Sequence, residues 1–202
     1  MLIGHIEALF RYPVKSMRGE RLEAAALGWH GIDGDRRLAL RRVDDRSGFP
    51  WLTATKVPEL LMFGPEREED AGAEDLPSHV RTPAGKLLPV FGDELAAEIT
   101  RRFGSAVQMT HLKHGIFDDA AISVIATATV DGITGLAECE SDVRRFRPNI
   151  LVRLLQSGPF QEDAWLSGSL RFGETESAPA VSVTARDVRC AMVNFDPDTV
   201  EA

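Results

Sequence analysis

The chain has 202 residues and a formal net charge of −8, and 44% of its residues are hydrophobic. This length and composition suit a folded protein of one domain or of two closely associated domains. The acidic excess argues against broad binding to nucleic acids or anionic membranes, because such binding depends on clustered Lys and Arg. Two cysteines, Cys139 and Cys190, are too few for a disulfide framework, a four-cysteine zinc site or an ordinary iron–sulfur cluster.

The N-terminal residues lack the basic start and long apolar run of a signal peptide. No stretch reaches the roughly 18 apolar residues that a membrane helix needs. Together with the low cysteine content, this leads us to expect a protein of a reducing compartment, the cytoplasm.

Short runs that favour β-strands dominate the chain. Alternating apolar residues bounded by Gly, Pro or Asp predict strands over Ile3–Tyr12, Arg37–Val43, Val80–Pro89 (two strands around a turn at Pro83–Gly85), Ala106–Leu112, Ile150–Leu155, Ser169–Phe172 and Ala180–Val188. The acidic, aperiodic stretch Glu66–Ser78 predicts a solvated loop.

One helix is predicted over Asp93–Phe103, with Asp93 as its N-cap and Gly104 as its stop. Apolar residues at helical spacing give it one inward face, formed by Leu95, Ile99 and Phe103. A short helical turn is predicted over Val57–Met62.

A second helix is predicted over Ala126–Leu136, capped by Thr127 or Thr129. Its apolar residues are expected to face inward, namely Val130, Ile133 and Leu136. Many short strands with few helices predict a mainly β, α+β protein with β-barrel character rather than a doubly wound sheet. Gly115 and a pair of aspartates mark a boundary between a region 1–114 and a region 115–202.

Cys190 lies in the stretch VTARDVRCAMVNFDPDT, which reads as a strand that closes in an Asp-Pro-Asp turn. A thiolate is a soft metal ligand and a nucleophile, and a nearby guanidinium such as that of Arg189 or Arg186 favours this charged form. A buried structural cysteine is the alternative, and it is the more common fate of a free Cys.

Three basic motifs could bind an anion. YPVKSMRGE presents Lys15, Ser16 and Arg18 on one loop, the composition of an oxyanion grip or of a solvated basic loop. GIDGDRR places Arg36 and Arg37 at the start of a strand, so alternation turns one of them inward, which is costly unless it meets an anion.

The third motif is RRFRPNILVRL, in which Pro148 fixes a bend between Arg147 and Asn149. A fork of donors next to an amide suits a planar heterocycle or a phosphate, although this motif alone is a weak signal. The five histidines show no metal-ligand spacing, and His111 and His114 have no carboxylate that completes a set.

The order of the motifs YPVKS, GDRR, LTATK, FRPN, EDAW and RC followed by DPDT resembles the MOSC family, the molybdenum cofactor sulfurase C-terminal domain, with its N-terminal β-barrel domain. The chain looks most like bacterial YcbX-type proteins and the mitochondrial amidoxime-reducing component. This resemblance implies a β-barrel-like MOSC fold with an N-terminal region 1–114 and a MOSC domain 115–202 that is short at its C-terminus.

The resemblance further implies a molybdenum-pterin cofactor with Cys190 as the metal ligand and the catalytic residue. The positions that match the family's cofactor-binding residues are Lys15, Ser16, Arg36, Arg147, Asn149 and Arg189. The implied reaction is the reduction of an N-oxygenated small molecule, with a non-catalytic cofactor or sulfur carrier as the alternative. The family also carries an association with pyridoxal phosphate.

Two departures from the family pattern have consequences. Asp187 stands where many members have a second cysteine, which changes the charge beside Cys190. No ferredoxin-like domain is fused to this sequence, so the resemblance implies a separate electron-donor protein. A metal-free enzyme or redox sensor that uses Cys190 is a further alternative.

Overall fold

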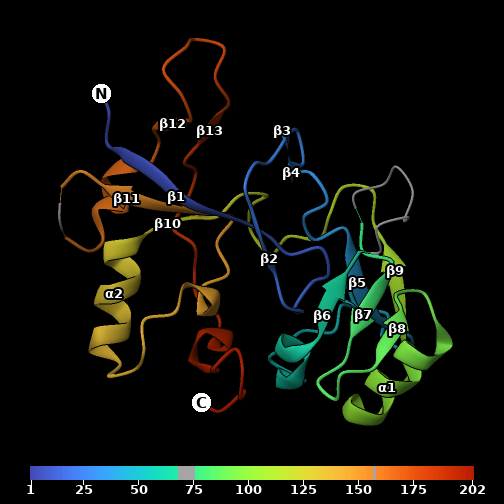
Figure 1. The fold of residues 1–202 in the computed structure, drawn as a ribbon. Helices are drawn as coiled ribbons and strands as arrows, with labels where there is room; N and C mark the ends of the chain where they lie inside the picture. Colours follow the sequence, from blue (N-terminus) through green and yellow to red (C-terminus); the bar gives the residue numbers. More distant parts are fainter. Residues whose placement is uncertain (68–75, 157) are drawn as a thin grey trace.

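A computed structural model describes residues 1–67, 76–156 and 158–202 (Figure 1). Its strands are β1 (Gly4–Arg11), β2 (Glu20–Leu22), β3 (Leu27–Gly28), β4 (Gly31–Ile32), β5 (Leu38–Arg42), β6 (Gly64–Glu66), β7 (His79–Arg81), β8 (Leu87–Pro89), β9 (Val107–His111), β10 (Val124–Ala126), β11 (Ile150–Leu154), β12 (Ser169–Arg171) and β13 (Ala180–Ser182). The α-helices are α1 (Asp93–Phe103) and α2 (Thr127–Leu136). Four short 3-10 helices are η1 (Pro58–Met62), η2 (Val143–Arg145), η3 (Gln161–Trp165) and η4 (Ala191–Asn194).

Figure 1 shows two groups of elements, one around β1, β11 and α2 and the other around β5, β9 and α1. In the first group the strand order is β10-β11-β1-β2, with β10 parallel to β11 and the other pairs antiparallel. In the second group β5 pairs with β9, and β6, β7 and β8 form a separate antiparallel sheet. The mainly β, α+β prediction is confirmed, and within the described residues the small sheets do not close into a barrel.

Three clusters of buried hydrophobic residues form the cores of these groups. The first core cluster joins β5, η1 and α1 through residues such as Leu40, Phe63 and Ile99. The second core cluster is smaller and consists of Ala8, Val130, Phe146 and Leu151. On β11 the neighbours of Leu151 point to the opposite face of the sheet and pack in a third cluster, as strand alternation requires.

Helix α1 matches its predicted range, but its cap differs from the prediction. The N-cap is Gly92, with no side-chain capping bond, so Asp93 is the first helical residue. Its carboxylate still lies in the first turn, where its negative charge interacts favourably with the helix dipole. The helix ends at Gly104 as predicted, because φ there is 85°, a left-handed conformation that glycine adopts without strain.

Helix α2 corrects two predictions. Leu136 is 81% exposed, so the inward face contains Val130 and Ile133 but not Leu136. Neither threonine is a side-chain N-cap. Instead Glu162 of the EDAW motif accepts hydrogen bonds from the Ala126 backbone N (2.6 Å) and the Thr129 hydroxyl (2.8 Å). The cap of α2 therefore comes from a distant segment, which a local sequence pattern does not reveal.

We predict that Glu162→Ala lowers the free energy of unfolding by about 1–2 kcal/mol, the usual cost of losing a helix cap. The change removes both acceptors at the start of α2. Denaturant unfolding measures the effect, and Glu174→Ala is the control, because that exposed glutamate makes no such contact. Equal stability of the two variants would show that the cap is not needed.

The last predicted strand is much shorter than expected. β13 ends at Ser182, and its ladder is finished by backbone bonds of Val183 with Gly168 and Ser167 (both 2.9 Å). Beyond Val183 the chain pairs with no strand among the described residues, and side-chain contacts hold it, such as Arg186 with Asp163 (2.6 Å). Cys190 consequently lies at the N-cap of η4 and not on a strand.

The acidic stretch Glu66–Ser78 is described only in part. Glu66 belongs to β6 and forms an ion pair with Arg81 (2.6 Å), so it is not a loop residue. Residues 68–75 of that prediction lie outside the described residues. None of the described helices combines the length and the hydrophobicity that a membrane crossing requires.

Candidate functional site

The basic motifs meet around the buried ring of Tyr12, which directly follows β1. The Arg147 guanidinium carbon lies 4.2 Å from the ring centroid, and that of Arg36 lies 4.9 Å from it. Burial raises the pKa of Tyr12 to about 12, although the two arginines oppose this shift. Tyr12 is thus a neutral aromatic platform that holds two cations together. The sequence analysis did not single it out.

Asp35 is the buried anion beneath this platform. It accepts a hydrogen bond from the Tyr12 backbone N (2.7 Å) and forms an ion pair with Arg36. The carboxylate has no exposed surface, so these two partners stabilise its charge. Sequence analysis missed Asp35, even though an inward arginine at the start of β5 calls for a nearby carboxylate.

Arg36 and Arg37 have different partners, but strand alternation is not the reason, because both precede β5 and Arg36 lies in a turn with a φ of 49°. Arg36 points to the site, where it donates to the Arg147 carbonyl (3.2 Å) and to the Asn149 Oδ1 (3.4 Å). Arg37 points away from it and donates to the Lys113 carbonyl.

Asn149 is only 1% exposed, and both ends of its side-chain amide bind the protein. Its Oδ1 accepts from the Ser123 backbone N (3.1 Å), and its Nδ2 donates to the Phe10 carbonyl (3.3 Å). These bonds tie β1 to the segments that lead into β10 and β11. The observed contacts are those of a brace that positions Arg36 and Arg147.

Arg147 is a buried cation without a buried anion of its own. It donates to the Met17 carbonyl (2.7 Å), and no carboxylate among the described residues forms an ion pair with it. Burial lowers the pKa of Arg147 to about 10, and electrostatic interactions with Tyr12, Asp35 and Cys190 partly offset this shift. Such a guanidinium is strongly favoured to bind an anion.

Lys15 and Ser16 are buried, so the alternative of a solvated basic loop is wrong for both residues. The Lys15 ammonium contacts both oxygens of Asp118 (2.9 and 2.8 Å), and this carboxylate is 68% exposed. Burial lowers the pKa of Lys15, and the hydrogen bond with Asp118 opposes that shift. Asp118 therefore covers the ammonium from the solvent side.

The backbone is strained at three of the predicted site residues. Ser16, Arg36 and Arg147 have φ values of 68°, 49° and 50°, in the left-handed region that non-glycine residues rarely adopt. Each such conformation costs on the order of 1–3 kcal/mol and persists only where the surroundings enforce it. Strain of this kind gathers at binding and catalytic sites, and here it falls on the three basic motifs.

Arg189 and Cys190 approach from the C-terminal segment. Arg189 donates to the Phe146 carbonyl and to Asp187, which in turn accepts from the Ser123 hydroxyl (3.2 Å). Cys190 is exposed, so the alternative of a buried structural cysteine is wrong. Asp187 thus fastens the segment that carries Cys190 beside Arg147.

The arrangement can bind an anion and offer one soft metal ligand. Four cations, Lys15, Arg36, Arg147 and Arg189, come together with the Cys190 thiol. No group of three or more His, Cys, Asp or Glu residues that could hold a metal occurs in the described part of the chain. A metal at Cys190 therefore needs most of its ligands from a bound group.

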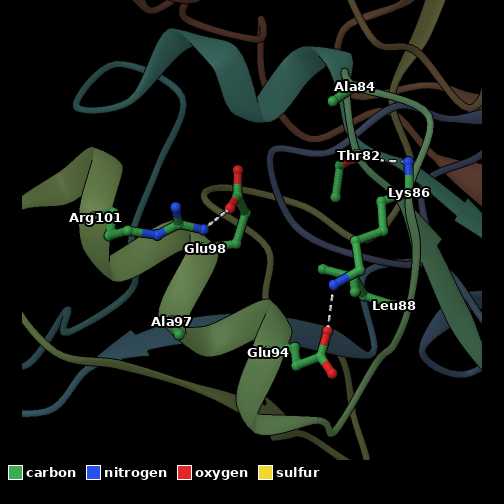
Figure 2. A pocket seen from close by; sticks show the side chains of 8 residues that line it. All are labelled: Thr82, Ala84, Lys86, Leu88, Glu94, Ala97, Glu98 and Arg101. Atoms are coloured by element: carbon green, nitrogen blue, oxygen red, sulfur yellow. Dashed lines mark hydrogen bonds and ion pairs between the residues drawn. The ribbon is translucent and has the colours of Figure 1, made fainter.

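Two other features do not belong to this site. The His114 Nδ1 lies 2.9 Å from the His30 Nε2, so His114 pairs across the fold and not with His111. Figure 2 shows a hollow between α1 and the β7–β8 hairpin, lined by charged residues. These charges neutralise one another through Lys86 with Glu94 (2.5 Å) and Arg101 with Glu98.

Comparison with known families agrees with this arrangement of motifs. The family model of the MOSC domain matches residues 100–202, and that of the MOSC N-terminal beta barrel domain matches residues 3–113. The chain belongs to the MOSC family. MOSC domains are associated with binding of the molybdenum cofactor. A search of curated proteins gave no match.

In this MOSC protein, we predict that Asp118→Asn strengthens the binding of inorganic phosphate about fivefold. The carboxylate occupies the position from which Lys15 would contact an anion, and solvent screening limits its effect to about 1 kcal/mol. Calorimetric titration measures the affinity. Asp119→Asn removes an exposed neighbouring charge and should change the affinity by less than twofold. Weaker binding in Asp118→Asn would contradict a site at Lys15.

Proposed function

We propose that this protein binds a molybdenum-pterin cofactor and reduces N-hydroxylated small molecules, with Cys190 as the protein ligand to the metal. The observation that carries the proposal is the buried Arg147 guanidinium, which pairs with no carboxylate in the described part of the chain and lies near the exposed Cys190 thiol. A phosphorylated ligand with soft sulfur donors would supply an anion for Arg147 and the further metal ligands that a metal at Cys190 needs.

The residues fit such a cofactor. Lys15 and Ser16 provide an ammonium and a hydroxyl for the phosphate, and Ser16 has the strained backbone of a binding turn. Arg36, Arg147 and Arg189 provide donors for the pterin and its charge. Asn149, which the resemblance assigns to the cofactor, would act by holding these arginines, because its amide is already bonded to the protein.

When bound, the cofactor supplies the two-electron chemistry that converts an N-hydroxylated compound to its amine and water. The chain contributes orientation and charge. Cys190 would hold the metal, and Arg147 and Arg189 would offset the negative charge of the cofactor. Because Cys190 is exposed, a small molecule from solvent could reach a metal held there. We assign the supply of electrons to a separate donor protein and place the reaction in the cytoplasm.

A second candidate function is a carrier of the cofactor or of sulfur without turnover. The exposed Cys190 favours it, because an accessible ligand can also pass its cargo to another protein. Steady reduction of an N-hydroxylated substrate with an artificial electron donor distinguishes the two. Sustained turnover that Cys190→Ala abolishes supports the enzyme, whereas full cofactor loading without turnover supports the carrier.

A further inference from the structure

The residues from Cys190 to Val200, here called the C-terminal strap, contact the hydrophobic cores of both groups of elements. Met192, Phe195 and Val200 pack against the first core cluster. Val193, within the same short segment, packs against the second core cluster. The strap is therefore a bridge between two separate cores, and Cys190 is its first residue.

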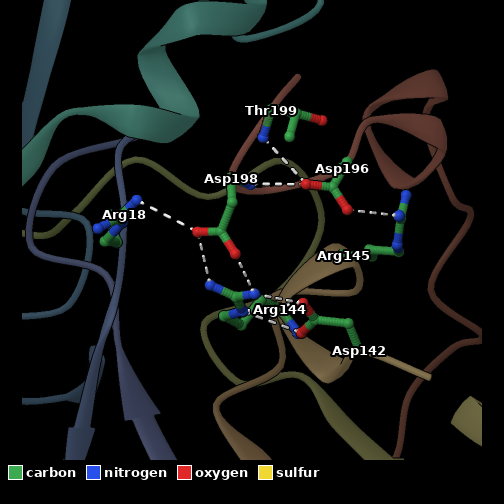
Figure 3. A network of polar contacts seen from close by, with 7 residues as sticks. All are labelled: Arg18, Asp142, Arg144, Arg145, Asp196, Asp198 and Thr199. Carbon is green, nitrogen blue, oxygen red and sulfur yellow. Dashed lines mark hydrogen bonds and ion pairs between the residues drawn. The ribbon is translucent and has the colours of Figure 1, made fainter. Parts of the chain in front are cut away.

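A network of ion pairs fastens the strap, centred on Asp198 (Figure 3). Both of its oxygens accept from the Arg144 guanidinium, at 3.0 and 2.7 Å. Arg18 also contacts this carboxylate, with its Nη2 at 3.4 Å from Oδ1. Asp142 holds Arg144 in place (2.7 Å), so the guanidinium is oriented before Asp198 binds it.

The neighbouring Asp196 makes the strap rigid. It accepts from the backbone N of Asp198 (2.9 Å) and of Thr199 (3.0 Å), and its other oxygen binds Arg145 (3.0 Å). Arg145 also donates to the Asn194 carbonyl (3.2 Å). The backbone hydrogen bonds lower the pKa of Asp196, and the side-chain hydrogen bonds from Arg144 lower the pKa of Asp198, so both carboxylates are ionised at neutral pH.

The arginines that hold Asp198 adjoin the motifs of the candidate site. Arg18 follows Ser16 by two residues, and Arg144 precedes Arg147 by three. Asp198 thus links two parts of the candidate site. One is the turn with Lys15 and Ser16, here called the phosphate-binding turn, and the other is the segment from Arg144 to Arg147. The strap brings Cys190 toward both. The three parts of the site come from distant regions of the chain, and this carboxylate links them.

We propose that Asp198 is a positioning residue that closes the C-terminal strap over the candidate site and fixes Cys190 relative to the phosphate-binding turn. The role in cofactor retention rests on the proposed function, whereas the closing of the strap does not. Loss of the bidentate Arg144 contact and the Arg18 contact is expected to open the strap about tenfold more often, which corresponds to about 1.4 kcal/mol.

The experiment compares the full chain with Asp198→Asn, which keeps the shape and removes the charge. Arg18→Gln is a milder second variant, and Asp198→Glu is the conservative replacement. Glu94→Gln is the control, because it breaks an exposed ion pair of similar type between Glu94 on α1 and Lys86 (2.5 Å). Hydrogen exchange of the strap and of α1 is measured without cofactor, and the rate of molybdenum loss is measured on loaded protein.

Asp198→Asn should speed exchange in the strap about tenfold and leave α1 unchanged, with a smaller increase in Arg18→Gln and recovery in Asp198→Glu. Molybdenum should leave the Asp198→Asn protein faster by a similar factor. Strap exchange within twofold of the wild type would overturn the proposal, and so would faster exchange without faster molybdenum loss. Wild-type protein that never acquires molybdenum would refute the proposed function, while the exchange data would still decide whether the strap closes.

Discussion

Arg147→Met is expected to weaken phosphate binding at least tenfold while changing the free energy of unfolding by less than about 1 kcal/mol. The side chain is buried, and its guanidinium has a backbone carbonyl and an aromatic ring as partners but no carboxylate. Burying this charge therefore costs free energy of folding, and the contacts of Arg147 offset only a small part of that cost. A bound anion changes that balance, so the lost affinity should exceed the lost stability.

Methionine suits this test, since it is unbranched at Cβ and adds no strain at the left-handed φ of residue 147. The loss of the contact with the Met17 carbonyl is offset by relief from burying a charge. Titration with phosphate and denaturant unfolding measure the two quantities. Arg147→Lys should retain part of the affinity, because it keeps the charge but not the fork of donors. A large loss of stability with unchanged affinity would assign Arg147 to the fold.

Asp35→Asn is expected to lower the free energy of unfolding by about 3 kcal/mol, because removing one partner of a buried ion pair leaves the other uncompensated. The new amide can still accept from the Tyr12 backbone N, but its NH₂ group would face the Arg36 guanidinium. Arg36 would then repack, and its contacts with Asn149 and the Arg147 carbonyl would weaken.

Denaturant unfolding of Asp35→Asn against Asp33→Asn tests this expectation. Asp33 is 70% exposed and lies 3.8 Å from Arg37, so its substitution should change the free energy of unfolding by less than about 0.5 kcal/mol. A similar small change in both variants would show that the Asp35–Arg36 pair contributes little. It would also remove the structural reason for the position of Arg36.

The sequence correctly predicted the helices and strands whose bounds depend on residues close to them in the chain. Helix α1 has an apolar face and a glycine stop within its own sequence, so its range was predicted correctly. The end of β13 depends on whether a partner strand continues, and the chain beyond Val183 has none. The cap of α2 comes from Glu162, which no local pattern around Thr127 could indicate.

The candidate site was predictable in its charged motifs but not in its supporting residues. Lys15, Arg36 and Arg147 were singled out from the sequence. The two arginines meet over Tyr12, and Lys15 lies close enough to both for their charges to lower its pKa. The cofactor-binding roles of these residues stay predictions. Asp35 and Asp118 were missed, because their importance arises from contacts with arginine and lysine that only folding brings about.

The molybdenum and pterin content of protein made in a cofactor-competent host and purified without oxygen tests the central claim most directly. Wild-type protein is predicted to contain both, and Cys190→Ala is predicted to lose most of the molybdenum. Cys139→Ala is the matched control, because this exposed cysteine lies at the end of α2 and should leave the content unchanged. Wild-type protein that holds neither molybdenum nor pterin, or Cys190→Ala protein with undiminished molybdenum, would contradict the assignment of Cys190 as the metal ligand.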